Sequence, residues 1–290
     1  ERIPMLKLSD IEREPAKLYI DKKSIADVDV IHHNLFTNQI AYLMLAFDCK
    51  KVPDELLPYV GLLSSVLGLM DTHRHTYPEL TNEININSGG ISTDAAIYTD
   101  SKDFSKYTVM YEVKGKVLYE KLPFVLEMMH EIIYETKFED EKRLREIIAR
   151  IKSRMESNMT GSGHTVAMLS AMAQFSPSSY YSDILRGYQY YEFIEKADRD
   201  FDSMKEMLAE NLKRTAALIF TKENLTVSFT AEDDGLELLQ KPMTEFVAKL
   251  AQLQEKDAVR NFRPVKEKTA YTSSSQVQYV ARCGNYRKAG

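Results

Sequence analysis

The sequence predicts an α+β fold in which a mostly antiparallel β-sheet has helices packed on one face. Three observations support this prediction: two candidate β-hairpins early in the chain, a long helical middle, and one late strand followed by a helix. Strands and helices do not alternate regularly, so a doubly wound parallel sheet is the less favoured alternative.

The composition is that of an ordinary folded protein with one large domain or two smaller ones. The chain has 290 residues, of which 44% are hydrophobic and 28% are charged. A net charge of -5, without a cluster of Lys and Arg, gives no electrostatic surface for nucleic acid or for a membrane. We therefore expect neither as a partner.

Cysteine usage and the start of the chain bear on its cellular compartment. Cys49 and Cys283 lie far apart and form no C-x-x-C motif, so neither a disulfide framework nor a cysteine zinc site is indicated. No signal peptide or transit sequence is recognisable. We expect the cytoplasm of a bacterium or an organelle matrix, and not secretion. The first residue is Glu and not Met, which indicates a fragment of a longer chain.

The beginning of the chain predicts an arm followed by a hairpin. Residues 1–24 contain Pro4 and Pro15 among charged residues and show no sustained period, so we expect an extended arm or linker. Apolar residues alternate in Val28–His32, and Ile40–Asp48 is strongly apolar. We predict that these two segments are strands that pair as a hairpin.

The most apolar segment, Leu56–Met70, predicts a helix that is enclosed on all sides. Val52–Glu55 precede it with a Pro and two acids, which suit the first turn of a helix. At about 15 residues the helix is too short for a bilayer, which needs about 20. Gly61 and Gly68 each cost about 1 kcal/mol relative to Ala in a helix, so they indicate close backbone packing.

A second hairpin is predicted after this helix. Pro78–Asn87 suggests a short helix, and Gly89-Gly90 suggests a turn that needs a positive φ. Ile91–Thr99 and Phe104–Val113 then alternate as two strands.

The long middle of the chain is predicted to be helical, because apolar residues recur there at the spacing of amphipathic helices. Gly161-Ser162-Gly163 interrupts this region, and we interpret it as a connection between helices rather than as a phosphate or nucleophile site. A strand follows at Leu225–Phe229, and Asp233–Gly235 breaks it. The predicted helices cover residues 118–132, 144–155, 164–174, 180–197, 201–218 and 236–253.

These patterns give the expected domain boundaries. Residues 25–254 form the α+β domain, and the polar, unpatterned residues 255–274 form a linker. Ser275–Cys283 predicts a strand, but the sequence ends before a partner strand. We therefore expect residues 275–290 to be the truncated first strand of a following domain.

The common catalytic motifs are absent: the chain has no G-x-S-x-G, G-x-G-x-x-G, P-loop or H-E-x-x-H sequence. The best metal-ligand candidates are His73, His75 and Glu79, which lie close together where the apolar helix ends. Zinc needs three or four converging ligands, and so short and partly helical a set has unfavourable geometry. A polar helix terminus is the favoured interpretation.

The other histidines and the tyrosines give no site. His32 and His33 face opposite sides of a strand and cannot share one site. His130 lies beside Met129 on a predicted helix, which suits a packed or rim position. The 17 tyrosines lack an accompanying basic face, so we expect packing and not stacking on bases.

Four segments in order along the chain carry a family resemblance: MLKLSDIEREP, VPDELLPYVGLLSSVLGLM, NSGGIS and GSGH. Together they resemble the presequence-protease branch of the insulinase (pitrilysin) zinc metallopeptidases, and specifically the third of four homologous domains with its preceding linker. The final QVQYVARCGNYRKAG resembles the opening strand of the fourth domain. The resemblance covers nearly all 290 residues and implies an insulinase-like α+β fold.

The resemblance implies a chamber of two halves that closes around unfolded peptides. The family holds zinc in its first domain, on an H-x-x-E-H helix; here Gly61–Ser65 stand in place of that motif. Without imidazole or carboxylate ligands, this chain is expected to have no catalytic residue and no cofactor, with zinc in the parent enzyme. The Arg and Tyr with which the family holds the substrate carbonyl belong to the fourth domain, beyond Gly290.

In the family's catalytic domain, the strand after the zinc helix pairs with the peptide as an added strand. The equivalent segment here is Ile91–Ile97. The resemblance therefore implies substrate contacts at Gly90, Ile91, Ser92 and Thr93 on the chamber wall.

We therefore expect a non-catalytic fragment of an intracellular zinc metallopeptidase that degrades short unstructured peptides. Its expected partners are the N-terminal catalytic half of the same chain and the peptide substrates. The alternative is an inactive subunit whose peptidase fold serves only assembly. A third possibility is a freestanding metal hydrolase that uses His73, His75 and Glu79.

Overall fold

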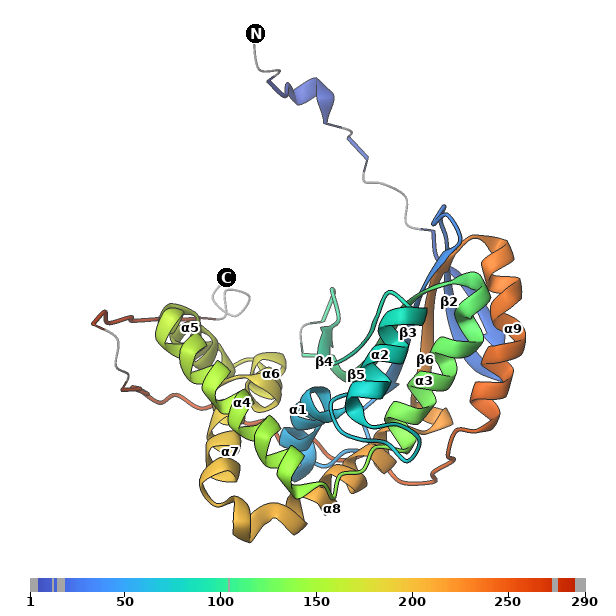
Figure 1. Ribbon diagram of the computed structural model, residues 1–290. Helices are drawn as coiled ribbons and strands as arrows, with labels where there is room; N and C mark the ends of the chain where they lie inside the picture. The colour runs from blue at the N-terminus through green and yellow to red at the C-terminus, as the bar shows by residue number, and fades with distance from the viewer. Residues whose placement is uncertain (1–4, 12, 15–18, 104, 273–275, 285–290) are drawn as a thin grey trace.

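The computed structural model describes residues 5–11, 13–14, 19–103, 105–272 and 276–284. Its centre is a six-stranded sheet with the order β1-β2-β6-β3-β5-β4 (Figure 1). All neighbouring strands are antiparallel except β2 and β6, which are parallel. The predicted α+β class is confirmed. The strands are β1 (Asp21–Ile25), β2 (Val28–Asn34), β3 (Ile40–Asp48), β4 (Ile91–Thr99), β5 (Tyr107–Leu118) and β6 (Leu225–Ala231).

The predicted hairpin between Val28–His32 and Ile40–Asp48 is wrong, because β6 lies between β2 and β3. β2 instead forms a hairpin with β1 through a turn in which Ala26 and Asp27 have φ values of 52° and 62°. The sequence period identifies a strand but not its partner, and β6 comes from the far end of the chain. β1 itself starts inside the predicted arm, since its residues are mostly exposed and do not alternate.

The second predicted hairpin is confirmed, because β4 and β5 pair antiparallel from Ile91 opposite Gly115 onward. The preceding turn has a positive φ of 109° at Gly90, as expected. β5 runs on to Leu118, which the sequence pattern assigns to the next helix. Residue 104, the predicted start of this strand, lies outside the described residues.

The most apolar segment forms the short 3₁₀ helix η2 (Asp54–Leu56) and helix α1 (Leu57–Val66), most of whose residues are buried. Its place in the core is confirmed. The helix ends before the predicted Met70, because Leu67 is extended and Gly68 has a φ of 78°. Gly68 therefore serves a turn and not close packing.

Gly61 marks the closest approach of α1 to helix α6 (Pro177–Arg186). A Cβ atom at this position would overlap the carbonyl oxygen of Leu185 and lie 3.0 Å from the ring of Tyr190. The two backbones come this close because glycine has no side chain. Close packing at Gly61 is thus confirmed.

The helices form a layer over one face of the sheet. Helices α3 (Leu122–Tyr134) and α9 (Asp233–Ala248) pack together beside β5 and β6, while α1 and α6 contact β4. Figure 1 shows α4, α7 and α8 on the far side of α1 from the sheet. The remaining helices are α2 (Tyr77–Asn87), α4 (Glu141–Gly161), α5 (Gly163–Ala173), α7 (Tyr188–Arg199), α8 (Phe201–Ile219), η1 (Leu8–Asp10), η3 (Tyr119–Lys121) and η4 (Lys222–Asn224).

The helix boundaries agree with the sequence pattern at one interruption and differ at two. Gly161-Ser162-Gly163 separates α4 from α5, as predicted. The run predicted over 180–197 is divided at Gly187 into α6 and α7. Asp233–Gly235 follows the end of the strand at Ala231, as predicted, but it also forms the first turn of α9, where the two acids face the positive end of the helix dipole.

The helices cover only one face of the sheet. In β6, Leu225, Val227, Phe229 and Ala231 are buried, whereas the residues between them are partly exposed. The described helices leave that second side uncovered, so the predicted arrangement is confirmed. We call it the open face; near its middle it carries Ser92, Lys114, Lys116, Tyr42, Met44, Ser228 and Thr230.

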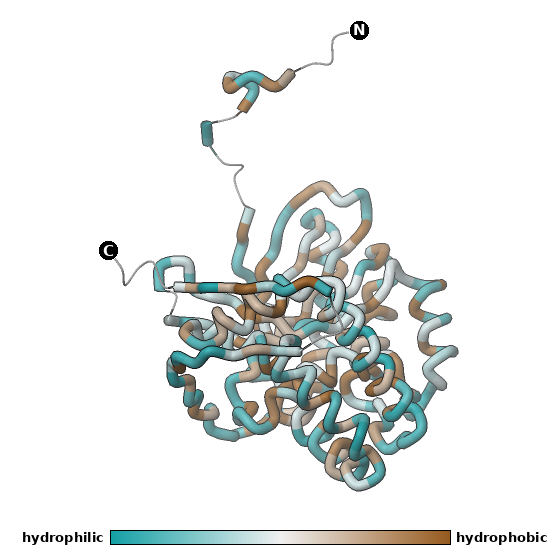
Figure 2. The backbone as a smooth tube through the Cα atoms, turned by 90° about the vertical axis from the view of Figure 1, so that its left-hand side faces the viewer, coloured by the Kyte–Doolittle hydropathy of each residue, from teal (hydrophilic) through white to brown (hydrophobic). Residues whose placement is uncertain are grey.

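Residues 255–272 form no helix or strand, but they are bound to the helix layer. The guanidinium of Arg260 donates to Asp54 Oδ1 at 2.9 Å, and also to two backbone carbonyls. Farther on, the ring of Tyr271 lies 3.9 Å from that of Tyr188. The segment follows the outside of the helices in Figure 1, and its sequence intermixes hydrophilic residues with Val259, Phe262 and Val265. Figure 2 shows hydrophilic and hydrophobic residues intermixed along much of the backbone. The mixture in residues 255–272 explains why the sequence of this segment looks unpatterned.

The strand predicted over Ser275–Cys283 is not formed, because residues 276–284 have no regular secondary structure. Residue 275 and residues 285–290 lie outside the described part of the chain. A strand needs a neighbour to accept and donate backbone hydrogen bonds, and no described segment pairs with this one. Tyr279 instead packs beside Gly163 at the start of α5. The assignment of this segment to a following domain stays a prediction.

Gly61→Ala should lower the free energy of unfolding by about 2–3 kcal/mol, because overpacking typically costs about 1–3 kcal/mol and the added methyl overlaps a backbone carbonyl. Urea denaturation measures the effect. Gly161→Ala is the matched control, since a Cβ there meets nothing within 4 Å. Equal stabilities of the two variants would contradict the close contact of α1 with α6.

Candidate functional site

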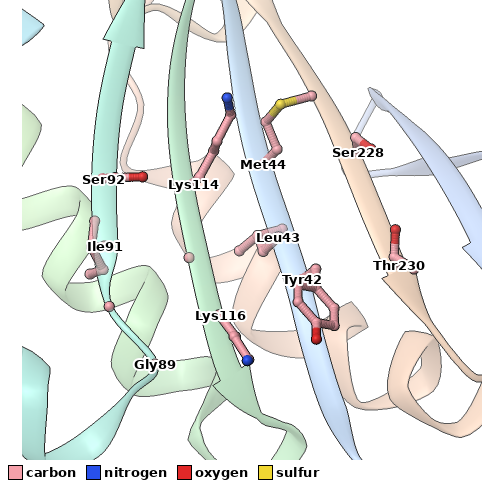
Figure 3. A pocket seen from close by; sticks show the side chains of 12 residues that line it. Tyr42, Leu43, Met44, Gly89, Ile91, Ser92, Lys114, Lys116, Ser228 and Thr230 are labelled. Carbon is pink, nitrogen blue, oxygen red and sulfur yellow. The ribbon is translucent and has the colours of Figure 1, made fainter. Parts of the chain in front are cut away.

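The open face is hollowed where β4, β5, β3 and β6 lie side by side. The hollow has a volume of about 370 Å³. Figure 3 shows Lys114, Met44 and Ser228 next to one another on adjacent strands, with Lys116, Tyr42 and Thr230 along the same strands. The hollow is lined by Tyr42, Leu43, Met44, Gly89, Gly90, Ile91, Ser92, Lys114, Gly115, Lys116, Ser228 and Thr230.

Strand register brings these side chains together. Lys114 pairs with Ser92 on one side and with Met44 on the other, which places the three side chains in one row across the sheet. Lys116 pairs with Tyr42 in the next row. Cross-strand neighbours of this kind lie about 4.5–5.5 Å apart, so each row can act on one ligand.

The charge of Lys114 is already matched within the sheet. Its ammonium forms a short ion pair with Glu112, a residue only 1% exposed. The hydroxyl of Tyr98 donates a second short hydrogen bond to the same carboxylate. This bond, together with desolvation and the charge of Glu112, raises the pKa of Tyr98 to about 12.

Lys116 is different, because no described carboxylate lies within 4 Å of its ammonium. The nitrogen lies 5.5 Å from the centre of the Tyr42 ring, a cation–π distance. Its aliphatic stem lies against Gly89, where a Cβ atom would be 3.0 Å from the Lys116 side chain. The side chain is therefore confined between a glycine and an aromatic ring.

Of the four residues predicted to contact substrate, three line the hollow and one does not. Gly90, Ile91 and Ser92 line the hollow. Thr93 does not, since its hydroxyl donates to the carbonyl of Ser64 on α1 at 3.2 Å. Thr93 can therefore reach a ligand only through its backbone.

The outer edge of β4 is unpaired in the part of the chain that the structure describes. The amide of Lys116 donates to the carbonyl of Gly90, so the even-numbered residues of β4 direct their backbone groups to β5. The odd-numbered residues, including Ile91, Thr93 and Ile97, therefore direct theirs outward. This edge can accept an added strand.

The candidate metal ligands do not converge. His75 Nδ1 lies 2.8 Å from Glu131 Oε1, and Glu79 accepts from the backbone and hydroxyl of Thr76 as part of a capping box. The backbone amide of His73 donates to the carbonyl of Glu135. No group of three or more His, Cys, Asp or Glu residues within the described ranges could hold a metal ion.

His75 instead belongs to a network around Glu131, which is completely buried on α3. The Thr72 hydroxyl forms a short hydrogen bond to Glu131 Oε1, and Arg74 Nε lies 3.2 Å from Oε2. The network ties the loop after α1 to α3. The network lies on the helix side of the sheet and not at the hollow, so its role is to hold this loop in place.

The other histidines have packing roles. His32 is buried with Nε2 3.0 Å from the carbonyl oxygen of Ala231, whereas His33 lies on the opposite side of the strand, as predicted. His130 packs with its ring centre 4.9 Å from that of Tyr134. Desolvation lowers the pKa of His130, in keeping with a packed histidine.

The segment Gly61–Ser65, where the resemblance leads us to expect the counterpart of a zinc motif, lies in the middle of α1. Gly61 packs against α6, and the Ser64 hydroxyl donates to the Gly61 carbonyl at 2.7 Å. These five residues supply neither an imidazole nor a carboxylate. They could not assemble a zinc site of nitrogen and carboxylate ligands.

Comparison with known protein families identifies the family of this chain. The family of domains associated with subfamily C of the M16 peptidases matches residues 1–196. The chain belongs to this family. Its relatives place it in the presequence-protease branch of the M16 peptidases.

Three relatives illustrate the match. Protein HypA of Clostridium perfringens is 32% identical over 100% of this chain and 30% of its own length. Presequence protease 1, chloroplastic/mitochondrial, of Arabidopsis thaliana is 27% identical over 99% of this chain and 27% of its own. The mitochondrial presequence protease of Xenopus tropicalis is 26% identical over 94% of this chain and 26% of its own length. The chain thus spans less than a third of the length of these relatives.

A solved structure supports the fold. The peptidase M16 inactive domain from Pseudomonas fluorescens superposes with a TM-score of 0.55 at 15% identity, covering 86% of this chain and 54% of that one. Within the described residues, every helix is too short or too polar to cross a bilayer.

The sequence does not identify the residues of β5 and β3 that line the hollow. It does not single out Lys114 and Lys116, although polar residues alternate through this part of β5. That alternation is a signal that could mark them as residues of an exposed face. Tyr42 and Met44 could not be found in the same way, because β3 is apolar on both sides.

Glu131→Leu should lower the free energy of unfolding by about 2 kcal/mol, because Thr72 and His75 lose their buried acceptor, whereas Arg74 keeps Glu127 and Glu135. Urea denaturation tests this. The control is Glu127→Gln, which removes a more exposed partner of the same Arg74 and should cost less than about 1 kcal/mol. A similar loss in both variants would show that burial of Glu131 is not decisive.

Tyr98 should ionise near pH 12, and Glu112→Gln should bring its pKa down toward the ordinary value, because the hydrogen bond to Glu112 is the largest cause of the shift. The raised pKa means that this contribution to stability is complete below about pH 10 and is lost between about pH 10 and 12. Alkaline absorbance titration of each protein with and without Tyr98→Phe isolates the one tyrosine. An unchanged Tyr98 transition in Glu112→Gln would contradict the assignment.

Proposed function

We propose that this chain is the non-catalytic part of a larger zinc metallopeptidase that degrades short unstructured peptides, and that its open face forms part of the substrate chamber wall. The observation that carries the proposal is the sheet covered by helices on one face only, in a chain of the presequence-protease branch. Antiparallel sheets can leave one face to solvent, and the apolar side chains of Tyr42 and Met44 on this face suit contact with a ligand or partner.

The composition of the open face supports a wet chamber wall. Hydroxyl and ammonium groups from Ser92, Lys114, Ser228 and Thr230 are interspersed with the ring of Tyr42. Such a surface can stay hydrated and still contact peptides of many sequences, since it combines hydrogen-bonding groups with limited apolar area. It is less suited to a permanent dry interface, which is what a role in assembly alone would need.

Peptide would bind as an additional strand along the outer edge of β4. The outward-facing backbone groups of Ile91, Thr93 and Ile97 supply donors and acceptors that any peptide sequence can use. This mode fits an unstructured substrate, because the peptide backbone gives affinity while the side chains are free to vary. Gly90, Ile91 and Ser92 would then contact peptide side chains at the rim of the hollow.

Bond cleavage would depend on the catalytic half of the parent chain. That half would hold the zinc ion, while the present chain supplies volume and substrate contacts. The helix α1 supports this division of labour, because Gly61–Ser65 offer no zinc ligand. We expect the protein to act in a bacterial cytoplasm or an organelle matrix, since relatives are named as mitochondrial or chloroplastic presequence proteases.

Thr93→Pro in the full-length gene product should raise the KM for an unstructured peptide about fivefold with little change in kcat. The substitution removes one outward-facing N–H, whose hydrogen bond to the peptide would contribute about 1 kcal/mol to binding. Proline is tolerated at this edge, where the N–H is not used by β5. The matched control is Thr93→Val, which loses the same hydroxyl bond to Ser64 and keeps the N–H. Both variants should behave alike if β4 does not pair with substrate.

Hydrogen exchange gives an independent test on the unmodified protein. Bound peptide should slow amide exchange in Ile91–Ile97, because an added strand protects outward N–H groups. The inner strand β3 serves as the internal reference, since its amides are already paired on both sides. Unchanged exchange across Ile91–Ile97 would contradict peptide addition at this edge.

A further inference from the structure

The charges that line the hollow are all positive. Lys114 and Lys116 are the charged residues among those that form its wall, in a chain whose net charge is -5. Glu112 lies on the same side of β5 but is only 1% exposed, and its carboxylate is held by Lys114 and Tyr98. Asp94 lies opposite Glu112 on β4, so the positive charge of the wall is concentrated at Lys116.

The two lysines are not equivalent. Glu112 neutralises Lys114 at short range, whereas Lys116 has no carboxylate of the described chain within 4 Å. Contact with Gly89 and with the ring of Tyr42 limits the conformations of the Lys116 side chain. Less conformational entropy is therefore lost when its ammonium binds an anion.

The register connects Lys116 with the outer edge of β4. The Lys116 amide donates to the carbonyl of Gly90, so the two residues lie opposite each other, and a Cβ atom on Gly90 would meet nothing within 4 Å. A peptide strand added to β4 would lie two strand spacings from β5, which is about 10 Å. A glutamate and a lysine side chain together can span that distance across the bare backbone of Gly90.

We infer that Lys116 is a specificity-determining residue that binds a carboxylate of the peptide, most favourably a glutamate side chain that lies over Gly90 on the open face. Ser92 offers a hydroxyl donor on the same face of β4, and the ring of Tyr42 lies 5.5 Å from the Lys116 ammonium. This inference rests on the proposed function, because it assumes a peptide strand on β4. It adds a substrate class: unstructured peptides with an acidic residue at one position.

The test uses the 290-residue chain and two capped decapeptides that differ only in one central residue, Glu or Gln. Amide shifts of Gly89, Gly90 and Ser92 in ¹H–¹⁵N NMR spectra report binding. The Glu peptide should bind about two- to fivefold more tightly, the range expected for one exposed ion pair. The preference should shrink at high salt, because exposed charges are screened.

Three variants sharpen the test. Lys116→Gln should abolish the preference, whereas the matched control Lys102→Gln, which replaces an exposed lysine outside the hollow, should keep it. Glu112→Gln releases the ammonium of Lys114 and should increase the preference for Glu. Thermal unfolding of each variant checks that it is folded.

The outcomes separate the two proposals. Equal binding of both peptides by the unmodified chain, with shifts along β4, overturns the role of Lys116 and leaves peptide addition standing. A preference for Glu that survives in Lys116→Gln also overturns it. Absence of shifts with both peptides overturns peptide binding at β4, and the carboxylate contact with it.

Discussion

Strand β6 enters the sheet between β2 and β3, and the packing of the whole molecule depends on this insertion. It joins the β1–β2 hairpin to the β3–β5–β4 part of the sheet through one parallel and one antiparallel ladder. Its buried side, from Leu225 to Ala231, meets α9, which follows it directly in the chain. The burial of these apolar side chains favours the insertion of β6 between β2 and β3. Because the strand comes late in the sequence, the fold forms only when both ends of the domain meet.

The two faces of the sheet lie in different environments, one against the helices and one toward solvent. On the helix side, tight contacts such as Gly61 against Leu185 and the buried Glu131 network fix the helices in one arrangement. On the open side, charges are either matched within the sheet, as in Lys114 with Glu112, or left facing solvent, as in Lys116. The first face specifies the fold, while the second is free to carry function.

The segment Gly61–Ser65 shows how packing limits what a helix can carry. Gly61 brings the backbone of α1 into contact with that of α6. A histidine or glutamate at Gly61 would collide with the Leu185 carbonyl, so packing and metal binding exclude each other at this residue. At this position the space serves helix packing.

The sequence by itself determined the α+β class, the buried α1, the β4–β5 hairpin and the positive φ at Gly90, because each depends on local periodicity or on glycine conformation. Through a family resemblance it also led to the expectation of substrate contacts at Gly90, Ile91, Ser92 and Thr93. Only the tertiary structure decided that β2 and β3 are not partners, that His75 binds Glu131, and that Lys116 faces a hollow beside Tyr42. These are contacts between residues far apart in the chain, and a period in the sequence records which side of an element is buried but not which element lies against it.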